Sequence, residues 1–350
     1  MEYIYHLISD CIFEIFNTME DTKIALQLCL SNNKNFKYFY HIHNLELNSL
    51  INSDSINKLL DVRKLILSQS FDSQLILSRF TSLLEISNLI CYGKYPNDIR
   101  LLKYLTRLVY YNDKHYLVDQ INGAWFPNLR YVQYHDSFFS NFSHNLCIEY
   151  IEYLNIYQRY DNDIAVKDKN YLSYLKIVNS CLHSDRYTIE LYQLTCLKYL
   201  HFSSCSLVKQ LIPEHFKSLQ CLIFKNVNLS QNTTLSFPNV EILKFSNITQ
   251  QIVILNMICL TKLQCHRSPN IVIRSGVDKL EKLYIRTDSI VEFNMNNVRS
   301  IITMKSFKKI YLNAYLKPEV FKKYHKLFQK LNVKVKYGQG IKKLYQYLLQ

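Results

Sequence analysis

The chain has 350 residues, of which 48% are hydrophobic and 20% charged, so it is long and apolar enough to bury a large core. Its 5 glycines are too few and too scattered for phosphate-cradling loops or dinucleotide-binding turns, which need glycine for close backbone approach. The net charge is +14, and residues 305–350 carry most of the excess, since their many lysines face a single acid, Glu319.

The N-terminal segment does not have the pattern of a targeting signal. Its sequence, MEYIYHLISDCIFEIFNTME, lacks a basic start and carries acids within the apolar stretch. The longest apolar run, 252–260, is interrupted by Asn256 and is too short to span a bilayer. Without a secretory signal, we expect the 10 cysteines to be reduced thiols. These features predict a cytoplasmic protein, with the nucleus as an alternative, and no membrane partner.

Residues 6–39 have the periodicity of three short helices. The first has one apolar face, made of Ile12, Ile15, Phe16 and Met19. Asp21 can cap a second helix, and a short aromatic and basic segment follows it. We therefore expect a small helical module at residues 1–40.

This three-helix pattern resembles the F-box family. The comparable positions are Leu7, Asp10, Ile12, Ile15, Phe16, Ala25, Leu26, Leu30, Lys34, Phe36 and Phe39. The resemblance implies docking on a Skp1-like protein through Leu7, Ile8, Ile12, Ile15, Phe16, Leu26 and Leu30. However, Ile8 stands where the family usually has proline, and no tryptophan ends the motif. The alternative is an N-terminal cap that covers the first layer of the core.

A pattern of apolar positions then recurs at intervals of about 18 to 25 residues, with a longer gap before the last one. Its anchor positions are Leu45, Leu65, Leu84, Leu108, Val132, Leu154, Leu175, Leu200, Leu222, Leu243, Leu263, Leu283 and Ile310. The residue three before each anchor is apolar in every case except Thr81, and the residue two after is apolar in every case. Five residues after the anchor, a small polar residue or cysteine is common, as at Cys205 and Ser268.

This pattern resembles the leucine-rich repeat, LxxLxLxx(N/C)xL, over residues 41–315. The resemblance implies an α/β solenoid, in which each repeat supplies one short strand to a parallel β-sheet horseshoe and returns by a loop or short helix. A small polar residue at the turn can bond unpaired backbone groups. Two repeats open alike, with FPNL at 126–129 and FPNV at 237–240.

Residues 316–350 have the pattern of a basic C-terminal cap. The segment 318–331 begins with proline, a good first helical residue, and alternates an apolar face with lysines. The segment 332–337, NVKVKY, alternates as a strand does.

We find no motif that predicts catalysis, a cofactor or a metal site. There is no CxxC pair and no GxSxG turn. His41 and His43 have no carboxylate or cysteine beside them, whereas Cys205 and Cys265 occupy core positions of the repeat. We therefore expect a chain that is not an enzyme.

The residues that flank the anchors are expected to point outward from the sheet. They include Arg107, Tyr131, Tyr153, Tyr174, Tyr199, His201, Lys244, Lys262, His266, Lys282, Tyr284 and Arg286. A concave sheet lined with tyrosine, lysine and arginine suits a protein interface, because tyrosine and arginine supply much of the binding energy there. Tyrosine is also a good strand former, so its frequency has a purely structural explanation too.

Together, the patterns predict a monomeric, non-catalytic adaptor, and the resemblance to the F-box family implies that it holds a protein substrate for a cullin-type (SCF) ubiquitin ligase. One alternative is a leucine-rich-repeat scaffold unconnected with ubiquitin. Another is nucleic-acid binding through the basic C-terminus, which is disfavoured because the lysines of that segment alternate with an apolar helical face.

Overall fold

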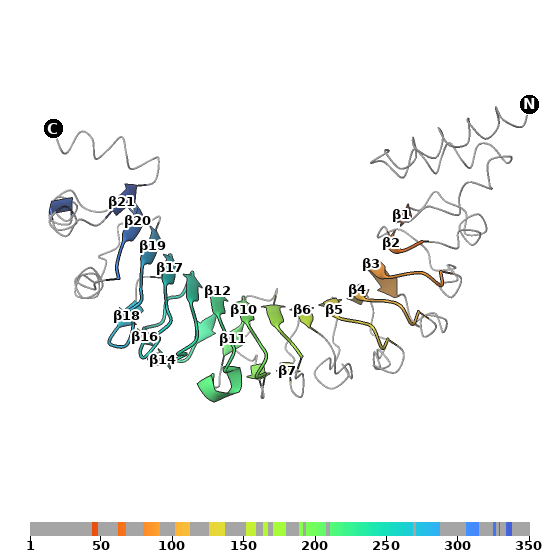
Figure 1. Cartoon of the computed structure of the whole chain (residues 1–350), viewed down its shortest axis with the longest axis horizontal. Coiled ribbons are helices and arrows are strands. Elements are labelled where there is room, and N and C mark those ends of the chain that lie inside the picture. Colours follow the sequence, from red (N-terminus) through yellow and green to blue (C-terminus); the bar gives the residue numbers. More distant parts are fainter. Residues whose placement is uncertain are drawn as a thin grey trace, which may run out of the picture. The chain divides into compact units, whose positions relative to one another are not determined.

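The computed structural model, drawn in Figure 1, describes strands and turns between residues 44 and 337. The described residues are 44–47, 62–67, 80–91, 102–112, 126–136, 152–158, 164–166, 171–179, 189–191, 194–207, 211–268, 271–287, 306–314, 325–326, 329 and 334–337. The chain divides into two compact units, the first made of residues 1–140 with 145–154 and the second of residues 141–144 with 155–350.

The first unit contains a parallel sheet whose strands pair in chain order. They are β1 (Asn44–Leu47), β2 (Lys64–Leu67), β3 (Glu85–Cys91), β4 (Arg107–Asn112) and β5 (Tyr131–Asp136). The register aligns Leu45 with Leu65, and Leu108 with Val132. The strand β6 (Tyr153–Gln158) begins in this unit and ends in the second. The predicted anchors therefore pair with one another, with one exception.

The exception is Leu84, whose assignment as an anchor is wrong. Ile86 pairs with both Leu65 and Leu108 and is fully buried, whereas Leu84 is 37% exposed. A β-bulge follows, because Ser87 and Asn88 together oppose Val109 and bring Leu89 opposite Tyr110. Because of the extra residue, the apolar residue in register with Tyr110 is Leu89 and not residue 88, which is a polar asparagine. With Ile86 as anchor the position two residues later is therefore polar, and the sequence pattern fits better with the anchor at Leu84.

The second unit contains the parallel strands β8 (Tyr174–Asn179), β10 (Tyr199–Ser203), β12 (Cys221–Lys225), β15 (Ile242–Ser246), β17 (Lys262–His266), β19 (Lys282–Thr287), β20 (Lys309–Ala314) and β21 (Lys334–Tyr337). They pair in that order, and Figure 1 shows them side by side. The register aligns Leu175, Leu200, Leu222, Leu243, Leu263, Leu283 and Ile310. These anchors are confirmed.

The core of each repeat is built from two columns of inward side chains, the anchor and the residue two after it. Because strand side chains alternate, both point to the same side of the sheet. In the second unit, Phe202, Phe224 and Phe245 occupy the later column and stack in series, with each neighbouring pair of ring centroids 5.7 Å apart. All three rings are almost completely buried.

A tight turn precedes β3, β4, β5, β10, β12, β15, β17 and β19 and explains the apolar residue three before the anchor. The N–H of that residue donates to the carbonyl three residues earlier, as from Leu129 to Phe126 and from Val240 to Phe237. In the FPNL and FPNV repeats, the asparagine side chain also donates to the preceding repeat. Asn128 reaches the carbonyl of Lys103 at 2.8 Å and Asn239 that of Lys217 at 2.6 Å. The shared motif therefore ties neighbouring repeats together.

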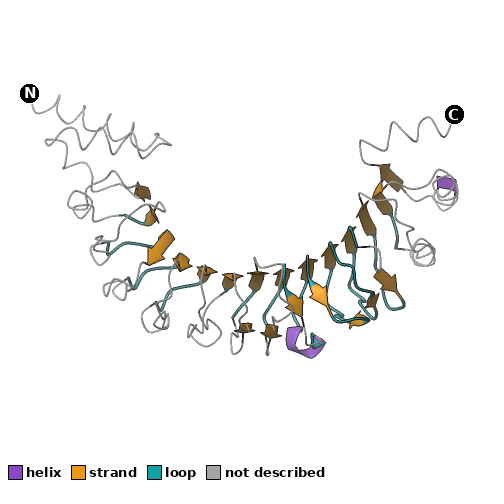
Figure 2. Ribbon diagram, turned by 180° about the vertical axis from the view of Figure 1, so that it is seen from behind, coloured by secondary structure: helices purple, strands orange, loops and turns teal. Residues whose placement is uncertain are grey.

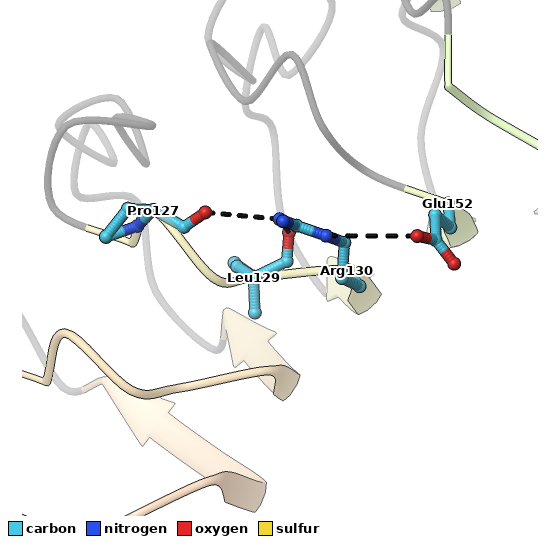
Figure 3. Close-up of polar contacts among 4 residues, drawn as sticks. All are labelled: Pro127, Leu129, Arg130 and Glu152. Carbon is cyan, nitrogen blue, oxygen red and sulfur yellow. Dashed lines mark hydrogen bonds and ion pairs between the residues drawn. The ribbon is translucent and has the colours of Figure 1, made fainter.

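Arg130 adds a second link at the same turn (Figure 3). Its guanidinium donates to the carbonyls of Pro127 and Leu129 at 3.1 and 3.2 Å. The Nε atom lies 3.8 Å from a carboxylate oxygen of Glu152, which holds the equivalent position one repeat later.

A turn with a left-handed backbone residue follows the strands β10, β12, β15 and β17. In the second unit these residues are Ser204, Asn226, Asn247 and Arg267, with φ between 47° and 56°. Each donates its N–H to the carbonyl of the residue three after the anchor of the next repeat, for example from Asn226 to Ser246 at 2.8 Å. The regular turn thus connects each repeat to the next.

Small polar residues at this turn bond backbone groups, as the sequence predicted. The hydroxyl of Ser268 donates to the carbonyl of His266 at 2.9 Å and accepts from the N–H of Ile248 at 3.1 Å. The thiol of Cys205 donates to the carbonyl of Ser203 at 3.0 Å. Both side chains are buried.

The return segments of the second unit form three small parallel sheets. Their strands are β7 (Ile164–Val166) with β9 (Ile189–Leu191), β11 (Ser206–Leu207) with β13 (Asn228–Leu229), and β14 (Thr233–Leu235) with β16 (Ile252–Ile254) and β18 (Ile271–Ile273). Gly276 turns the chain after β18 with φ of +69°, and a Cβ there would lie 2.7 Å from the Cα of Asn256. Glycine is required at that position by both backbone angle and space.

The described residues contain little helix, which corrects the α/β expectation to a parallel-strand solenoid (Figure 2). Helical backbone occurs in the 3₁₀ turn η5 (Pro213–Phe216) and at His325, Lys326 and Gln329 within the expected C-terminal helix. The expected strand at 332–337 is β21. The predicted N-terminal helices lie outside the described residues. None of the described helical residues belongs to a helix long and apolar enough to cross a membrane.

Candidate protein-binding surface

The outward side chains of the strands form a surface that we call the strand face. It consists of the residues one before, one after and three after each anchor, because these alternate with the two inward columns. Every predicted substrate-binding residue lies on it, and none is buried. Lys282 and Arg286 are exposed and the others are half-buried. The strand register brings them together as rows that run from repeat to repeat.

In the first unit, Arg107, Tyr131 and Tyr153 form one such row. The guanidinium carbon of Arg107 lies 4.1 Å from the centre of the Tyr131 ring. The Tyr131 and Tyr153 rings stack with centroids 4.2 Å apart and planes within 12°. An arginine over an aromatic ring is attracted by the ring's negative face, so the row is ordered without any partner.

Two outward residues on the same strand as Tyr131, Gln133 and His135, were not predicted from the sequence. The hydroxyl of Tyr131 donates to Gln133 at 3.0 Å, and Gln133 in turn lies 2.6 Å from the Nε2 atom of His135. Both stand in the outward columns after Val132, so strict use of the repeat positions would have found them. Their ordinary polar character gave no chemical signal.

In the second unit, Tyr174 and Tyr199 stack in the same manner. Their ring centroids are 4.3 Å apart and the planes differ by 6°. The edge of His201 meets the Tyr199 ring at 6.5 Å in a T-shaped arrangement. The three rings form an aromatic platform across β8 and β10, in which the His201 ring stands at 81° to that of Tyr199.

Lysines surround this platform and alter the titration of His201. Burial of the imidazole, followed by the charges of Lys176, Lys225 and Lys244, lowers the pKa of His201 from 6.5 to about 4. The side chain is therefore neutral at pH 7. Its Nε2 atom is buried and has no hydrogen-bond partner among the described residues. Lys225 was not predicted, although it stands three residues after the anchor Leu222.

A second aromatic pair lies on β19 and β20. The rings of Tyr284 and Tyr311 stack with centroids 4.1 Å apart, and the Lys262 and Lys309 ammonium groups lie 5.0 and 4.7 Å from the centres of Tyr284 and Tyr311 respectively. Burial, together with a hydrogen bond to the neighbouring Tyr311 phenol, raises the pKa of Tyr284. Lys309 was not predicted, although it occupies the same column as Lys282.

His266 lies between these two clusters. Its Nδ1 atom is 3.1 Å from the hydroxyl of Ser246, one strand away. Burial and the charges of Arg286, Arg267 and Lys225 lower the pKa of His266. Like His201, it contributes a polar, uncharged ring to a row of cations at pH 7.

The described residues give no sign of a catalytic or metal site. They contain no cluster of three or more His, Cys, Asp or Glu residues that could hold a metal ion. Cys205 and Cys265 are buried free thiols, and burial raises the pKa of Cys265 to about 12. A thiol with that pKa is a poor nucleophile at neutral pH. The F-box-like residues Leu7, Ile8, Ile12, Ile15, Phe16, Leu26 and Leu30 lie outside the described residues.

Comparison with known proteins rests on structure. No protein-family model matches the chain, and no curated protein matches it. The leucine-rich-repeat domain of APL1B is similar at 16% sequence identity and a TM-score of 0.52, over 85% of this chain and 87% of that one. InlJ and the internalin InlF of Listeria monocytogenes align at 16% and 13% identity, with TM-scores of 0.43 and 0.46, over 81% and 89% of this chain and 70% and 89% of theirs. The similarity to APL1B and the parallel register assign the repeats to the leucine-rich-repeat fold.

Proposed function

We propose that the chain is a non-catalytic adaptor that holds a partner protein on its strand face. The observation that carries this proposal is the set of three stacked tyrosine pairs on the strand face, each with a lysine or an arginine nearby. Large aromatic side chains supply much of the energy at protein interfaces. Because these rings are already ordered by stacking, binding costs little side-chain entropy.

Photo-crosslinking tests this proposal with a matched pair of positions. p-Benzoylphenylalanine replaces Tyr284 on the strand face or Tyr171 on a turn, where the side chain is 55% exposed. Both variants are expressed as the full chain in cells that contain the natural partner. We expect a discrete crosslinked protein from position 284, competed by excess unlabelled chain, and none from position 171. Equal crosslinking from both positions would contradict the proposal.

The finer proposal, that the adaptor serves an SCF ubiquitin ligase, is supported by the F-box-like pattern of residues 1–40. In it, this segment docks on a Skp1-like protein, residues 41–315 hold the substrate and residues 316–350 cap the array. Such a chain would act in the cytoplasm or nucleus. The alternative is a repeat scaffold whose residues 1–40 are a cap only.

A pull-down distinguishes these two roles. The full chain and its Ile15→Asp and Phe16→Asp variants are mixed with a purified Skp1-like protein. Capture by the unmodified chain that is lost in both variants supports the ligase role, provided that their unfolding midpoints are unchanged. Failure of the unmodified chain to capture it favours the scaffold alternative.

A further inference from the structure

The strand face of the second unit carries charge of one sign. The strands β8, β10, β12, β15, β17, β19, β20 and β21 contain no aspartate or glutamate. Their outward cations include Lys225, Lys244, Lys262, Lys282, Arg286 and Lys309. A row of cations without intervening acids raises the local concentration of anionic partners.

Two described acidic residues of this unit lie beside the strand face and not on it. Glu241 and Glu281 stand two residues before the anchors Leu243 and Leu283, where the turn enters the strand. Glu281 is paired there with Lys308, whose ammonium lies 2.6 Å from a carboxylate oxygen. These two carboxylates therefore lie at the entry to β15 and β19, and not on the strand face.

The strand face of the first unit has a different charge pattern. Lys64 and Glu85 occupy equivalent positions on neighbouring strands, and their charged atoms lie 3.7 Å apart. A cation opposed by a carboxylate contributes little attraction to a distant anion. The excess positive charge on the strand face thus belongs to the second unit.

We propose that the partner segment held by the second-unit strand face is an acidic, carboxylate-rich stretch of protein. This inference rests on the proposed adaptor function and names the chemistry of its partner. The ammonium groups of Lys262 and Lys309 are held over tyrosine rings, where they are positioned to meet carboxylates. The exposed edges of the stacked Tyr284 and Tyr311 rings offer apolar surface to the aliphatic part of the segment.

The stacking of the tyrosines favours a peptide over a nucleic acid. A single strand of nucleic acid binds by stacking its bases on free aromatic faces. Here Tyr284 and Tyr311 cover each other, and lysines lie over both rings, so these ring faces have neighbours already. Tyr174 and Tyr199 likewise cover each other.

Fluorescence anisotropy of labelled poly-L-glutamate with the full chain tests the inference. The face variant Lys244→Glu/Lys282→Glu is compared with Lys217→Glu/Lys279→Glu, which makes the same change of net charge at exposed turn residues. We expect the face variant to weaken binding about tenfold or more and the turn variant about twofold, because the turn charges are screened. Circular dichroism checks that both variants remain folded.

Three results would overturn the inference. One is equal weakening by the two variants, and another is tighter binding of a single-stranded oligonucleotide than of poly-L-glutamate. The third is wild-type affinity for poly-L-glutamate that does not fall between about 50 and about 200 mM salt, since an electrostatic contact must weaken there whether or not the variants fold.

Crosslinking separates this inference from the function on which it rests. If Lys244→Glu/Lys282→Glu leaves the crosslink from position 284 intact, the inference that the partner segment is acidic is wrong, whereas the proposed adaptor function stands. If position 284 yields no crosslinked protein at all, the adaptor function itself is wrong.

Discussion

Leu200 and His201 are neighbours in β10 whose side chains point in opposite directions. Leu200 has no exposed surface and lies in register between Leu175 and Leu222. His201 is half-buried on the strand face. The same alternation decides which substitutions act on stability and which on binding.

We expect Leu200→Ala to lower the free energy of unfolding by about 2–5 kcal/mol, because it removes buried methyl groups and leaves a cavity. His201→Ala should change it by about 0.5 kcal/mol or less, as surface substitutions do. Urea unfolding of the two variants measures both values. Equal losses would mean that the strand register is wrong.

The pKa of His201 predicts how stability depends on pH. The folded chain has this pKa at about 4, below the ordinary value of 6.5, so the unfolded chain takes up the proton first as pH falls. The free energy of unfolding should therefore fall from pH 6.5 down to about 4 and be insensitive to this group above pH 6.5. In His201→Gln, the fall should be shallower.

The measurement is the free energy of unfolding at a series of pH values in both proteins. The pKa of His266 is also lowered, so this residue makes the free energy of unfolding fall with pH in the same direction. Because His266 is present in both the unmodified chain and His201→Gln, its contribution cancels when the two pH profiles are subtracted. Identical pH profiles would contradict the account of His201.

At the scale of the element, the turns after β12 and β15 carry a short ladder of hydrogen-bonded asparagine side chains, which is interrupted at the turn after β17. The amide of Asn247 donates to the side-chain oxygen of Asn226 at 2.6 Å. The next residue in the ladder is Arg267, and the side-chain oxygen of Asn247 is buried without a hydrogen-bond partner among the described residues. Arg267 also holds a left-handed backbone angle, φ 47°, that asparagine tolerates better.

Arg267→Asn should extend this ladder, whereas Arg267→Ala removes the guanidinium without offering a donor. We expect the asparagine variant to be more stable than the alanine variant by about 0.5–1.5 kcal/mol, the usual worth of one hydrogen bond. Thermal or urea unfolding of the pair gives the difference. An alanine variant at least as stable would show that the ladder does not extend to position 267.

The element scale also shows what the sequence could and could not predict. The anchors were readable because a buried column must be apolar in every repeat. The error at Leu84 had a warning in Thr81, the one polar residue three before an assigned anchor, but the bulge at Asn88 depends on how β3 meets β4. Periodicity cannot reveal an extra residue that the partner strand accommodates.

At the scale of the whole molecule, the same repeat positions recur in both units. The predicted face residues were found because outward columns follow from the anchors. The stacking of Tyr174 on Tyr199 was not predictable, since it requires two strands at known register. Lys225 and Lys309 were missed for a simpler reason, because only the most conspicuous residues of each outward column were selected.

The adaptor proposal and the inference of an acidic partner both rest on the division between inward and outward columns, and the native cysteines report on it directly. Cys196 is exposed on a turn, Cys221 lies on the strand face, and Cys205 and Cys265 face the core. Burial raises the pKa of Cys221 and raises that of Cys265 to about 12, which lowers the fraction of reactive thiolate at both positions.

Thiol labelling of the folded full chain, followed by mass spectrometry of each cysteine peptide, is the most direct test of this division. We predict that Cys196 reacts first and Cys221 more slowly, and that Cys205 and Cys265 react only when denaturant unfolds the chain. Labelling of Cys265 in the native protein as fast as that of Cys196 would contradict the register, and with it the assignment of the strand face.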